Sequence, residues 1–176
     1  MSMVEKHLDF MQYVKEVIDN VTSCRLMFNA KEAPRQNQYK VQSLSHPFFD
    51  SLRERIYVDN YKSIDPHALK LMDWQCLAIL YMCDGCLGAT GKCFSTTLNL
   101  CRLSYGDFML LKKSLKDTFD LEWNIVKTNR KYYTLRLRMK DFDKFMQGIA
   151  PFMFESFNYK LCLRTTNPST EGDEIV

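Results

Sequence analysis

Apolar residues recur at helical spacing in several separate stretches of this chain. Between residues 3 and 21 they fall at intervals of three and four, which predicts an amphipathic helix. Asp and Ser are good N-caps and Pro suits a first helical turn, so His46-Pro47, Asp65-Pro66, Asp73 and Ser104 mark further helix starts. The helices predicted after these signals run from Pro47 to Ile56, through Ala68 and Leu69, from Trp74 to about Cys83, and from Ser104 to Phe119. Another follows from Asp141 to Ile149, and residues 152–163 are expected to pack back onto the fold.

Strand patterns fill the stretches between these helices. Tyr39 and Val41 alternate with polar neighbours, and residues 92–102 are rich in threonine and apolar side chains. Trp123–Lys127 and Tyr132–Met139 predict a hairpin around Asn129. Loops and turns are predicted at residues 29–38 and at the glycines that follow the Trp74 helix, which are Gly85, Gly88 and Gly91.

The second strand of the predicted hairpin alternates most clearly. Apolar and basic side chains take opposite faces, and the basic face holds Arg136, Arg138 and Lys140. Residues i and i+2 of a strand are about 6.6–6.8 Å apart, close to the phosphate spacing of a DNA strand. Arginine can also read guanine in the major groove, where a two-stranded ribbon fits. This face predicts nucleic-acid contact, and the alternative is an ordinary solvated outer face.

The distribution of charge strengthens that prediction. The net charge of the 176 residues is only +3, but the tail from Arg164 is acidic and the remaining body is correspondingly more basic. Six basic residues and no acid lie between Lys127 and Lys140, which is a footprint for phosphate. The composition of residues 164–176 predicts a disordered tail. No apolar run is long enough to cross a membrane, so no membrane partner is expected.

The seven cysteines bear on compartment and on metal binding. Their number is odd and the N-terminus does not resemble a secretory signal, so reduced thiols in a cytosol-like compartment are expected, in a cytoplasm, an organelle matrix or a phage-infected cell. Cys83, Cys86, Cys93 and Cys101 could together hold zinc in an interaction module. Buried free thiols are the stronger interpretation because the spacing forms no regular zinc knuckle.

Residues Leu77–Gly85, reading L-A-I-L-Y-M-C-D-G, combine an apolar run with a terminal acid. Asp84 stands at the end of a predicted helix, where the macrodipole disfavours negative charge. A divalent cation, or a helix N-terminus facing it, would account for the acid. One carboxylate is half of a Mg²⁺ site for phosphodiester chemistry, which needs at least two acids. The alternative is a core helix whose last residue faces solvent.

These nine residues resemble the motif of the LAGLIDADG homing endonucleases, in the variant that ends Y-M-D-D-G. The resemblance continues on both sides: Lys62–Pro66 is similar to the K-x-I-P stretch before the motif, and Leu98–Ser104 stands where the family often reads L-n-T-q-s-F-T. Leu110–Leu121 is similar to the family's L-L-x-x-L-x-x-x-F-g-L helix, and 141–161 to its closing segment. The match therefore covers most of the chain.

The resemblance implies an α+β fold, a saddle of αββαββα repeats whose motif helices bring two acids to one metal site. It divides the chain into a partial first repeat (1–70), a complete repeat (71–163) and the tail (164–176). Asp84 would be the metal-binding acid, and Lys62 a weaker candidate for a charge-stabilising catalytic residue. The sheets would lie on DNA, with RNA as the alternative. The expected contact residues are Lys127, Lys131, Arg136, Arg138 and Lys140, extended by Lys40 and Gln42.

The positions at which this sequence departs from the family pattern are positions that bear on DNA cleavage. Cys83 replaces an Asp, and Leu100 with Cys101 replaces a polar pair that helps to hold the site water. Residues 5–66 resemble the stretch between two motifs, with no first motif before it. The motif helix would present an interface, between two copies or between subdomains, through Trp74, Leu77, Ala78 and Tyr81. Two copies could pair through this helix, or a separate chain could supply the missing half. Otherwise the scaffold has lost cleavage and binds nucleic acid as a transcription factor or maturase-like protein would.

Two functions therefore remain open beside the zinc module. The preferred one is a DNA-binding protein on a LAGLIDADG scaffold whose cleavage is lost or depends on a second chain. The other is an active Mg²⁺-dependent homing endonuclease, homodimeric or split, that makes double-strand breaks. A phage or organelle mobile element is one expected source, and a protein that serves its host genome is the alternative.

Overall fold

The computed structural model describes residues 1–32, 34–59, 61–90, 93–128 and 132–162. Its C-terminal part follows the order α4 (Trp74–Asp84), β6 (Gly85–Thr90), β7 (Cys93–Leu98), α5 (Tyr105–Phe119), β8 (Trp123–Thr128), β9 (Tyr132–Leu137) and α6 (Phe142–Ile149). The strands form an antiparallel sheet in the order β6-β7-β9-β8. This is the αββαββα order that the sequence predicted, and the mixed α+β class is confirmed.

The helix starts of this unit are those that the sequence marks. The Asp73 carboxylate accepts from the Cys76 backbone N–H (2.7 Å) at the start of α4. Ser104 and Asp107 form a reciprocal capping box at the start of α5. Gly85–Thr90 departs from the prediction, because it forms strand β6 where a turn was expected. The glycine ends the helix, and extended backbone continues directly from it.

The N-terminal part contains β1 (Ser2–Val4), α1 (Leu8–Asp19), β2 (Cys24–Asn29), β3 (Gln38–Ser43) and α2 (Pro47–Ile56). Its sheet has the order β1-β3-β2, and α1 packs on β2 and β3. The helix predicted from residue 3 is shorter, because residues 2–4 pair with β3 and a 3-10 turn (Glu5–His7) precedes α1. Strand β2 was not predicted, and the described residues between β2 and β3 (30–32 and 34–37) form neither helix nor strand, as the predicted loop requires.

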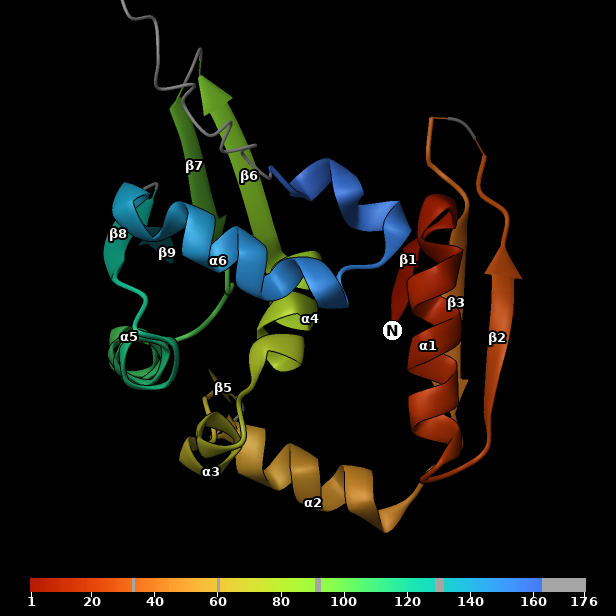
Figure 1. Cartoon of the computed structure of the whole chain (residues 1–176). Helices are drawn as coiled ribbons and strands as arrows, with labels where there is room; N and C mark the ends of the chain where they lie inside the picture. The colour runs from red at the N-terminus through yellow and green to blue at the C-terminus, as the bar shows by residue number, and fades with distance from the viewer. Residues whose placement is uncertain (33, 60, 91–92, 129–131, 163–176) are drawn as a thin grey trace, which may run out of the picture.

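The two units repeat one arrangement. The run β1-α1-β2-β3-α2 corresponds to β7-α5-β8-β9-α6, with strand orders β1-β3-β2 and β7-β9-β8. Counterparts of α4 and β6 are not among the described residues of the N-terminal unit. Figure 1 shows the two sheets on opposite sides of α4. The N-terminal unit therefore repeats the order of the C-terminal unit from β7 onward, among the residues that the structure describes.

Short elements join and close the two units. The hairpin β4 (Tyr57–Val58) and β5 (Tyr61–Lys62), followed by α3 (Pro66–Lys70), connects α2 to α4. After α6 come two 3-10 segments, η3 (Ala150–Phe152) and η4 (Glu155–Lys160). Segment η4 contacts α1, so the closing segment packs back onto the fold. No helix among the described residues is long and apolar enough to span a membrane.

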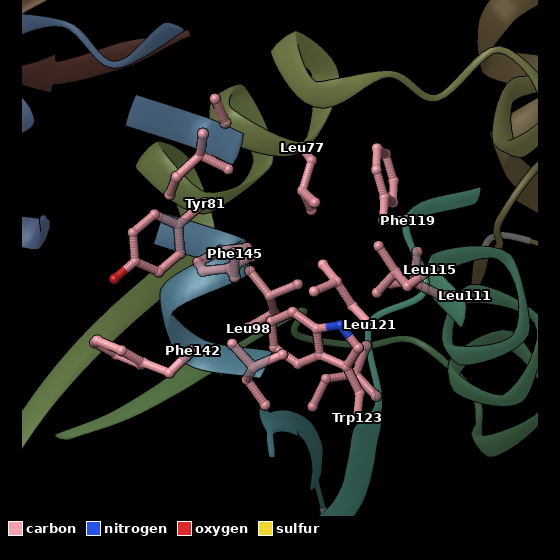
Figure 2. Close-up of a cluster of buried hydrophobic side chains, with 14 of the residues drawn as sticks. Leu77, Tyr81, Leu98, Leu111, Leu115, Phe119, Leu121, Trp123, Phe142 and Phe145 are labelled. Atoms are coloured by element: carbon pink, nitrogen blue, oxygen red, sulfur yellow. The ribbon is translucent and has the colours of Figure 1, made fainter. Parts of the chain in front are cut away.

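The main core lies between α4, α5, α6 and the C-terminal sheet. Tyr81 and Trp123 both pack edge-on against Phe145, at centroid distances of 5.2 and 5.6 Å. Figure 2 shows these rings with leucines from α4, α5 and the sheet converging on one cluster. A second, smaller cluster joins Phe10 of α1 to Met82 of α4 and Phe157 of η4. Helix α4 therefore contributes to both.

Candidate functional site: the motif helix and two open sheet faces

Helix α4 is apolar on every side, and one side is buried in the core of its own unit. Leu77, Ala78 and Tyr81 have no exposed surface, and the Trp74 ring lies 4.6 Å from the Phe119 ring. The burial of Leu77, Ala78 and Tyr81 within their own unit leaves these three residues no surface for pairing two copies of the chain. A role of this helix at an interface between subdomains stays a prediction. An all-apolar helix carries no periodic signal that would tell its core face from an interface face. Its other sides carry the exposed Gln75 and Cys76 and the half-buried Ile79 and Cys83.

The carboxyl end of α4 holds Asp84 at the surface. Asp84 is the last residue of the helix, its side chain is exposed, and its backbone carbonyl accepts from the Asn99 N–H (2.8 Å). The next residue must be glycine, because a Cβ at Gly85 would lie 2.0 Å from the Tyr81 ring and 2.4 Å from the Tyr81 carbonyl oxygen. The local fold thus turns the chain sharply from helix to strand and leaves the Asp84 carboxylate exposed.

Lys160 closes this end of the helix from the other side. Its Nζ donates to the carbonyl oxygens of Met82 (2.7 Å), Gly85 (2.8 Å) and Tyr81 (3.4 Å). The Tyr81 hydroxyl donates back to the Lys160 carbonyl (3.0 Å). A cation here complements the negative end of the helix dipole, although burial lowers the pKa of the ammonium group. Sequence reasoning gave Lys160 no role, because a lone lysine in a closing segment carries no periodic signal.

Strand register defines the open face of the C-terminal sheet. Leu135, Leu137 and Trp123 face the core, so their alternating neighbours face away from α5 and α6. Arg136 lies on this open face, in register with Asn124 of β8 and Thr97 of β7. Ser95, Val126, Thr128, Tyr132 and Thr134 share the face by the same alternation.

The predicted row of three cations on β9 is wrong beyond Arg136. The strand ends at Leu137, and Lys140 belongs to a 3-10 turn, Met139–Asp141. Arg138 and Lys140 both pair with Glu122, at 2.7 and 3.1 Å. The alternation rule holds only while the strand continues. Glu122 precedes the block 127–140, so a count of the charges within the block could not reveal this pairing.

The other basic candidates are scattered. Lys127 is exposed but pairs with Tyr133, which places it on the helix-covered side of the sheet, near the end of β8. Lys131 lies outside the described residues. Lys62 is exposed on β5, which Figure 1 places beside α3, at the opposite end of α4 from Asp84. A catalytic role for Lys62 beside Asp84 therefore has no geometric support.

The N-terminal sheet has an open face of the same kind. Val41 is buried under α1, so Lys40 and Gln42 point to the other side, as the prediction that they extend the surface requires. Arg25 lies in register with Gln42 on this face, and Asn29 with Gln38. Arg25 was missed because β2 was not recognised as a strand. None of the described positions on either open face is acidic.

Comparison with known proteins agrees with this architecture. The family model of the LAGLIDADG DNA endonuclease family matches residues 1–145. The chain belongs to the LAGLIDADG DNA endonuclease family. Among solved structures, it is similar to the homing endonuclease I-WcaI bound to its DNA recognition sequence, with a TM-score of 0.75 and 20% identity over 93% of this chain and 74% of that one.

A second similar structure is I-DmoI in complex with DNA and Mn, with a TM-score of 0.52 and 15% identity. The match covers 85% of this chain and 78% of that one. At these identities the likeness shows a shared LAGLIDADG fold.

The donor set at the LAGLIDADG motif fits half of a divalent-metal site. Carboxylate oxygen is a ligand that Mg²⁺ prefers. Across the part of the chain that the structure describes, however, no three His, Cys, Asp or Glu side chains come together in a way that could hold a metal ion. The same finding leaves the zinc alternative without support, although the side chain of Cys93 is outside the description. Burial raises the pKa of Cys83 to about 11, which keeps that thiol protonated.

Two departures from the LAGLIDADG pattern have clear positions. Leu100 is buried in the core at 6% exposure, whereas Cys101 is exposed at the turn after β7. Leu100 is therefore a packing residue here and offers no polar atom to a site. Cys83 is half-buried against the second cluster, so the position that is acidic in the family variant faces α1 and η4.

Proposed function

We propose that this protein binds DNA through the open faces of its two sheets and that cleavage requires a carboxylate in addition to Asp84. The observation that carries the proposal is the composition of those faces. Arg136, Arg25 and Lys40 lie among mostly amide and hydroxyl side chains, although Met27 is in register with Lys40, and the described positions include no acid. Such a surface suits phosphate contacts and readout of base edges. The DNA complexes of I-WcaI and I-DmoI support the same use of the fold.

Duplex DNA is the favoured partner because both faces are sheets. A strand pair fits the major groove, and Arg136 can form two hydrogen bonds to a guanine. Asn124, beside it in register, can do the same with an adenine. Recognition would then depend on Arg136 and Asn124 together, with Arg25 and Lys40 holding the phosphate backbone on the N-terminal side.

Asp84 would supply one oxygen ligand to Mg²⁺ if a second acid were brought to it. That acid would come from another segment, a separate chain or a second copy. A second copy would have to use the sides of α4 near Gln75 and Cys76, because the side with Leu77 and Tyr81 is buried. The chain alone is therefore expected to bind DNA without making double-strand breaks.

Two double variants with the same change of charge test the binding surface. Arg136→Ala with Lys40→Ala removes two cations from the open faces, whereas Arg138→Ala with Lys140→Ala removes two that pair with Glu122. Binding is measured between 50 and 200 mM salt, with duplexes selected from a random library. The first double variant should weaken binding and reduce the salt slope by about 2, and the second should change it little. Equal losses from both variants would refute the open faces as the binding surface.

Asp84→Asn tests the metal assignment separately. The variant should bind duplex DNA like the wild type, because Asp84 lies at the end of α4 and not on a sheet face. Plasmid libraries incubated with Mg²⁺ or Mn²⁺ report cleavage, and light scattering reports the mass of the protein with and without DNA. Breaks made by the wild-type monomer would contradict the need for a second carboxylate.

A further inference from the structure

A groove of about 610 Å³ lies at the end of the C-terminal sheet where β9 begins. Three tyrosines line it, Tyr57 from β4, Tyr61 from β5 and Tyr132 from β9, together with Lys62 and Arg102. The tyrosine side chains are 45%, 77% and 55% exposed. Three large rings in one exposed groove differ from scattered surface residues and indicate a binding site.

The two walls of the groove are fastened together beneath the surface by Asp107. One carboxylate oxygen accepts from the Ile64 N–H (2.9 Å) and the Ser63 hydroxyl (3.1 Å), next to β5. The other accepts from the N–H (3.0 Å) and hydroxyl (2.6 Å) of Ser104 on the opposite wall. These bonds hold the pKa of the buried Asp107 below its usual value, against the effect of burial. The groove is thus preformed, because both oxygens of the Asp107 carboxylate accept hydrogen bonds from its two walls.

The charge of the groove is positive. Lys62 and Arg102 are both exposed in it, and none of the described residues that line it is acidic. Arg102 adopts a left-handed backbone (φ 69°), which is uncommon for a residue with a side chain. Strain of this kind gathers at binding sites, where the surrounding structure maintains it. Here it sits in the turn that carries Arg102 to the groove.

The groove also continues from the open face of the sheet. Tyr132 lines the groove, and the alternation along β9 puts it on the same face as Thr134 and Arg136. A strand of nucleic acid that follows the open face would therefore meet the tyrosines at the sheet end. Aromatic rings beside cations match a ligand with flat bases and phosphates.

We propose that this groove binds unpaired nucleotides, whose bases stack on Tyr57, Tyr61 and Tyr132 and whose phosphates contact Lys62 and Arg102. The proposal rests on the proposed function for the class of ligand and adds a single-stranded segment to the duplex contacts. Bases within a duplex already stack on one another, so only an unpaired base can offer a face to these rings. A melted or single-stranded flank of the DNA site is the ligand that fits.

Binding of a dye-labelled 12-nucleotide oligo(dT), followed by fluorescence anisotropy, tests the proposal. Tyr61→Ala and Tyr132→Ala should each weaken binding about tenfold, whereas the corresponding phenylalanine variants should bind nearly like the wild type. Lys62→Gln with Arg102→Gln should reduce the salt slope. Tyr159→Ala is the matched control, because Tyr159 is 57% exposed but lies on η4, outside the groove. Tyr61 is so exposed that its variant is expected to fold, and circular dichroism is the check of its folding.

Duplex binding separates this proposal from the proposed function. Tyr61→Ala should leave duplex binding unchanged, and Arg136→Ala should weaken it. Oligo(dT) binding that is unaffected by the tyrosine variants, or absent in the wild type, would overturn the groove proposal while duplex binding persists. Loss of oligo(dT) binding in Tyr159→Ala, equal to that in Tyr61→Ala, would overturn it as well, since exposed tyrosines in general would then be responsible.

Discussion

The two units of this protein share one order of strands and helices but are stabilised differently. In the part of it that the structure describes, the C-terminal unit has a core of 17 buried residues, most of them from α4, the sheet, α5 and α6. Among its described residues, the N-terminal unit fully buries three hydrophobic side chains, which are Phe10, Met11 and Val41. Phe28 and Leu44 of that unit are more than half exposed. The same order of strands and helices therefore encloses a well-filled core in the C-terminal unit and a sparse core in the N-terminal unit.

The difference lies in what covers the inner side of α1. Phe10 packs edge-on against Phe154 and Phe157, at centroid distances of 5.4 and 5.6 Å, and lies in one cluster with Met82. Phe154 and Phe157 belong to the closing segment and Met82 to α4, so the N-terminal unit uses partners from outside itself. The comparison teaches that this topology fills its core only when a motif helix such as α4 contributes side chains to it. The N-terminal unit should therefore open at a lower free energy than the rest.

The largest expected difference between the two units comes from replacing one buried phenylalanine in each unit by alanine. Phe145 and Phe10 are both about 1% exposed or less, and replacement by alanine should cost about 3–5 kcal/mol at either site. Phe145→Ala should destabilise the whole chain. Phe10→Ala should release α1, β2 and β3 while α4 and α5 stay protected. Hydrogen exchange read by mass spectrometry distinguishes the outcomes, and uniform loss of protection in both variants would contradict two unequal units.

Gly85→Ala should show how tightly α4 is built into the C-terminal unit. A Cβ there meets the Tyr81 carbonyl at 2.4 Å, and backbone cannot move aside cheaply, so a loss of about 3 kcal/mol is expected. Gly106→Ala is the control, because its Cβ would meet nothing closer than the Ser104 hydroxyl at 3.6 Å. That helical position should gain up to about 1 kcal/mol. Thermal unfolding measures both, and similar melting temperatures for the two variants would refute the steric argument.

The sequence predicted the parts of this structure that short-range signals specify. The caps at Asp73 and Ser104 and the alternation of Leu135 and Leu137 are local patterns, and the structure contains each of them. Strand β2 escaped because it lies at the sheet edge with only Cys24 and Leu26 partly buried, so it lacks a clear alternation of apolar and polar residues.

The candidate site was less predictable because it depends on contacts between distant residues. Glu122 reaches Arg138 and Lys140 only after the chain turns at the end of β9. Lys160 reaches the end of α4 across more than seventy residues of sequence. Which side of α4 is buried also depends on packing, since Leu77, Ile79 and Leu80 are equally apolar in the sequence. The sequence patterns thus identified Asp84 and Arg136 as candidates. They could not show which of the nearby basic side chains pair with an acid.

Lys160→Met should loosen the contact that joins the closing segment to α4. The variant loses three hydrogen bonds from an ammonium group to helix-end carbonyls, with an expected cost of about 2 kcal/mol. Because η4 also holds Phe10, exchange should rise in α1 more than in α5. Lys144→Met is the control, since Lys144 donates to the Asp120 carbonyl and carboxylate on the surface and should contribute less than about 1 kcal/mol. Equal effects of the two variants would show that Lys160 is an ordinary surface lysine.

The smallest expected effect is a loss of stability in mild acid, which should occur in the N-terminal unit and not in the C-terminal unit. His7 stacks on Phe157 at 3.9 Å, and its Nδ1 lies 3.1 Å from the Ser156 hydroxyl, so it belongs to the contact between the N-terminal unit and η4. Burial, together with the nearby Lys6 and Lys160, lowers its pKa below 6.5, against the opposing effect of Asp9. The folded state thus favours the neutral ring. This contribution is complete above pH 6.5 and is lost as the pH falls below that value, by at most about 1.4 kcal/mol per pH unit.

The pH window also separates His7 from its acidic neighbour. Hydrogen bonds from Ser156 and Phe10 lower the pKa of Asp9 below 3.8 despite burial, so its contribution is complete above pH 3.8 and is lost only in stronger acid. Between pH 6.5 and 5, exchange corrected for its intrinsic rate should therefore rise in α1 and stay level in α5. His7→Phe keeps an aromatic ring against Phe157 without a titrating group, so it should remove the slope. A slope that persists in this variant would assign the acid sensitivity to another group and remove His7 from the contact that joins the units.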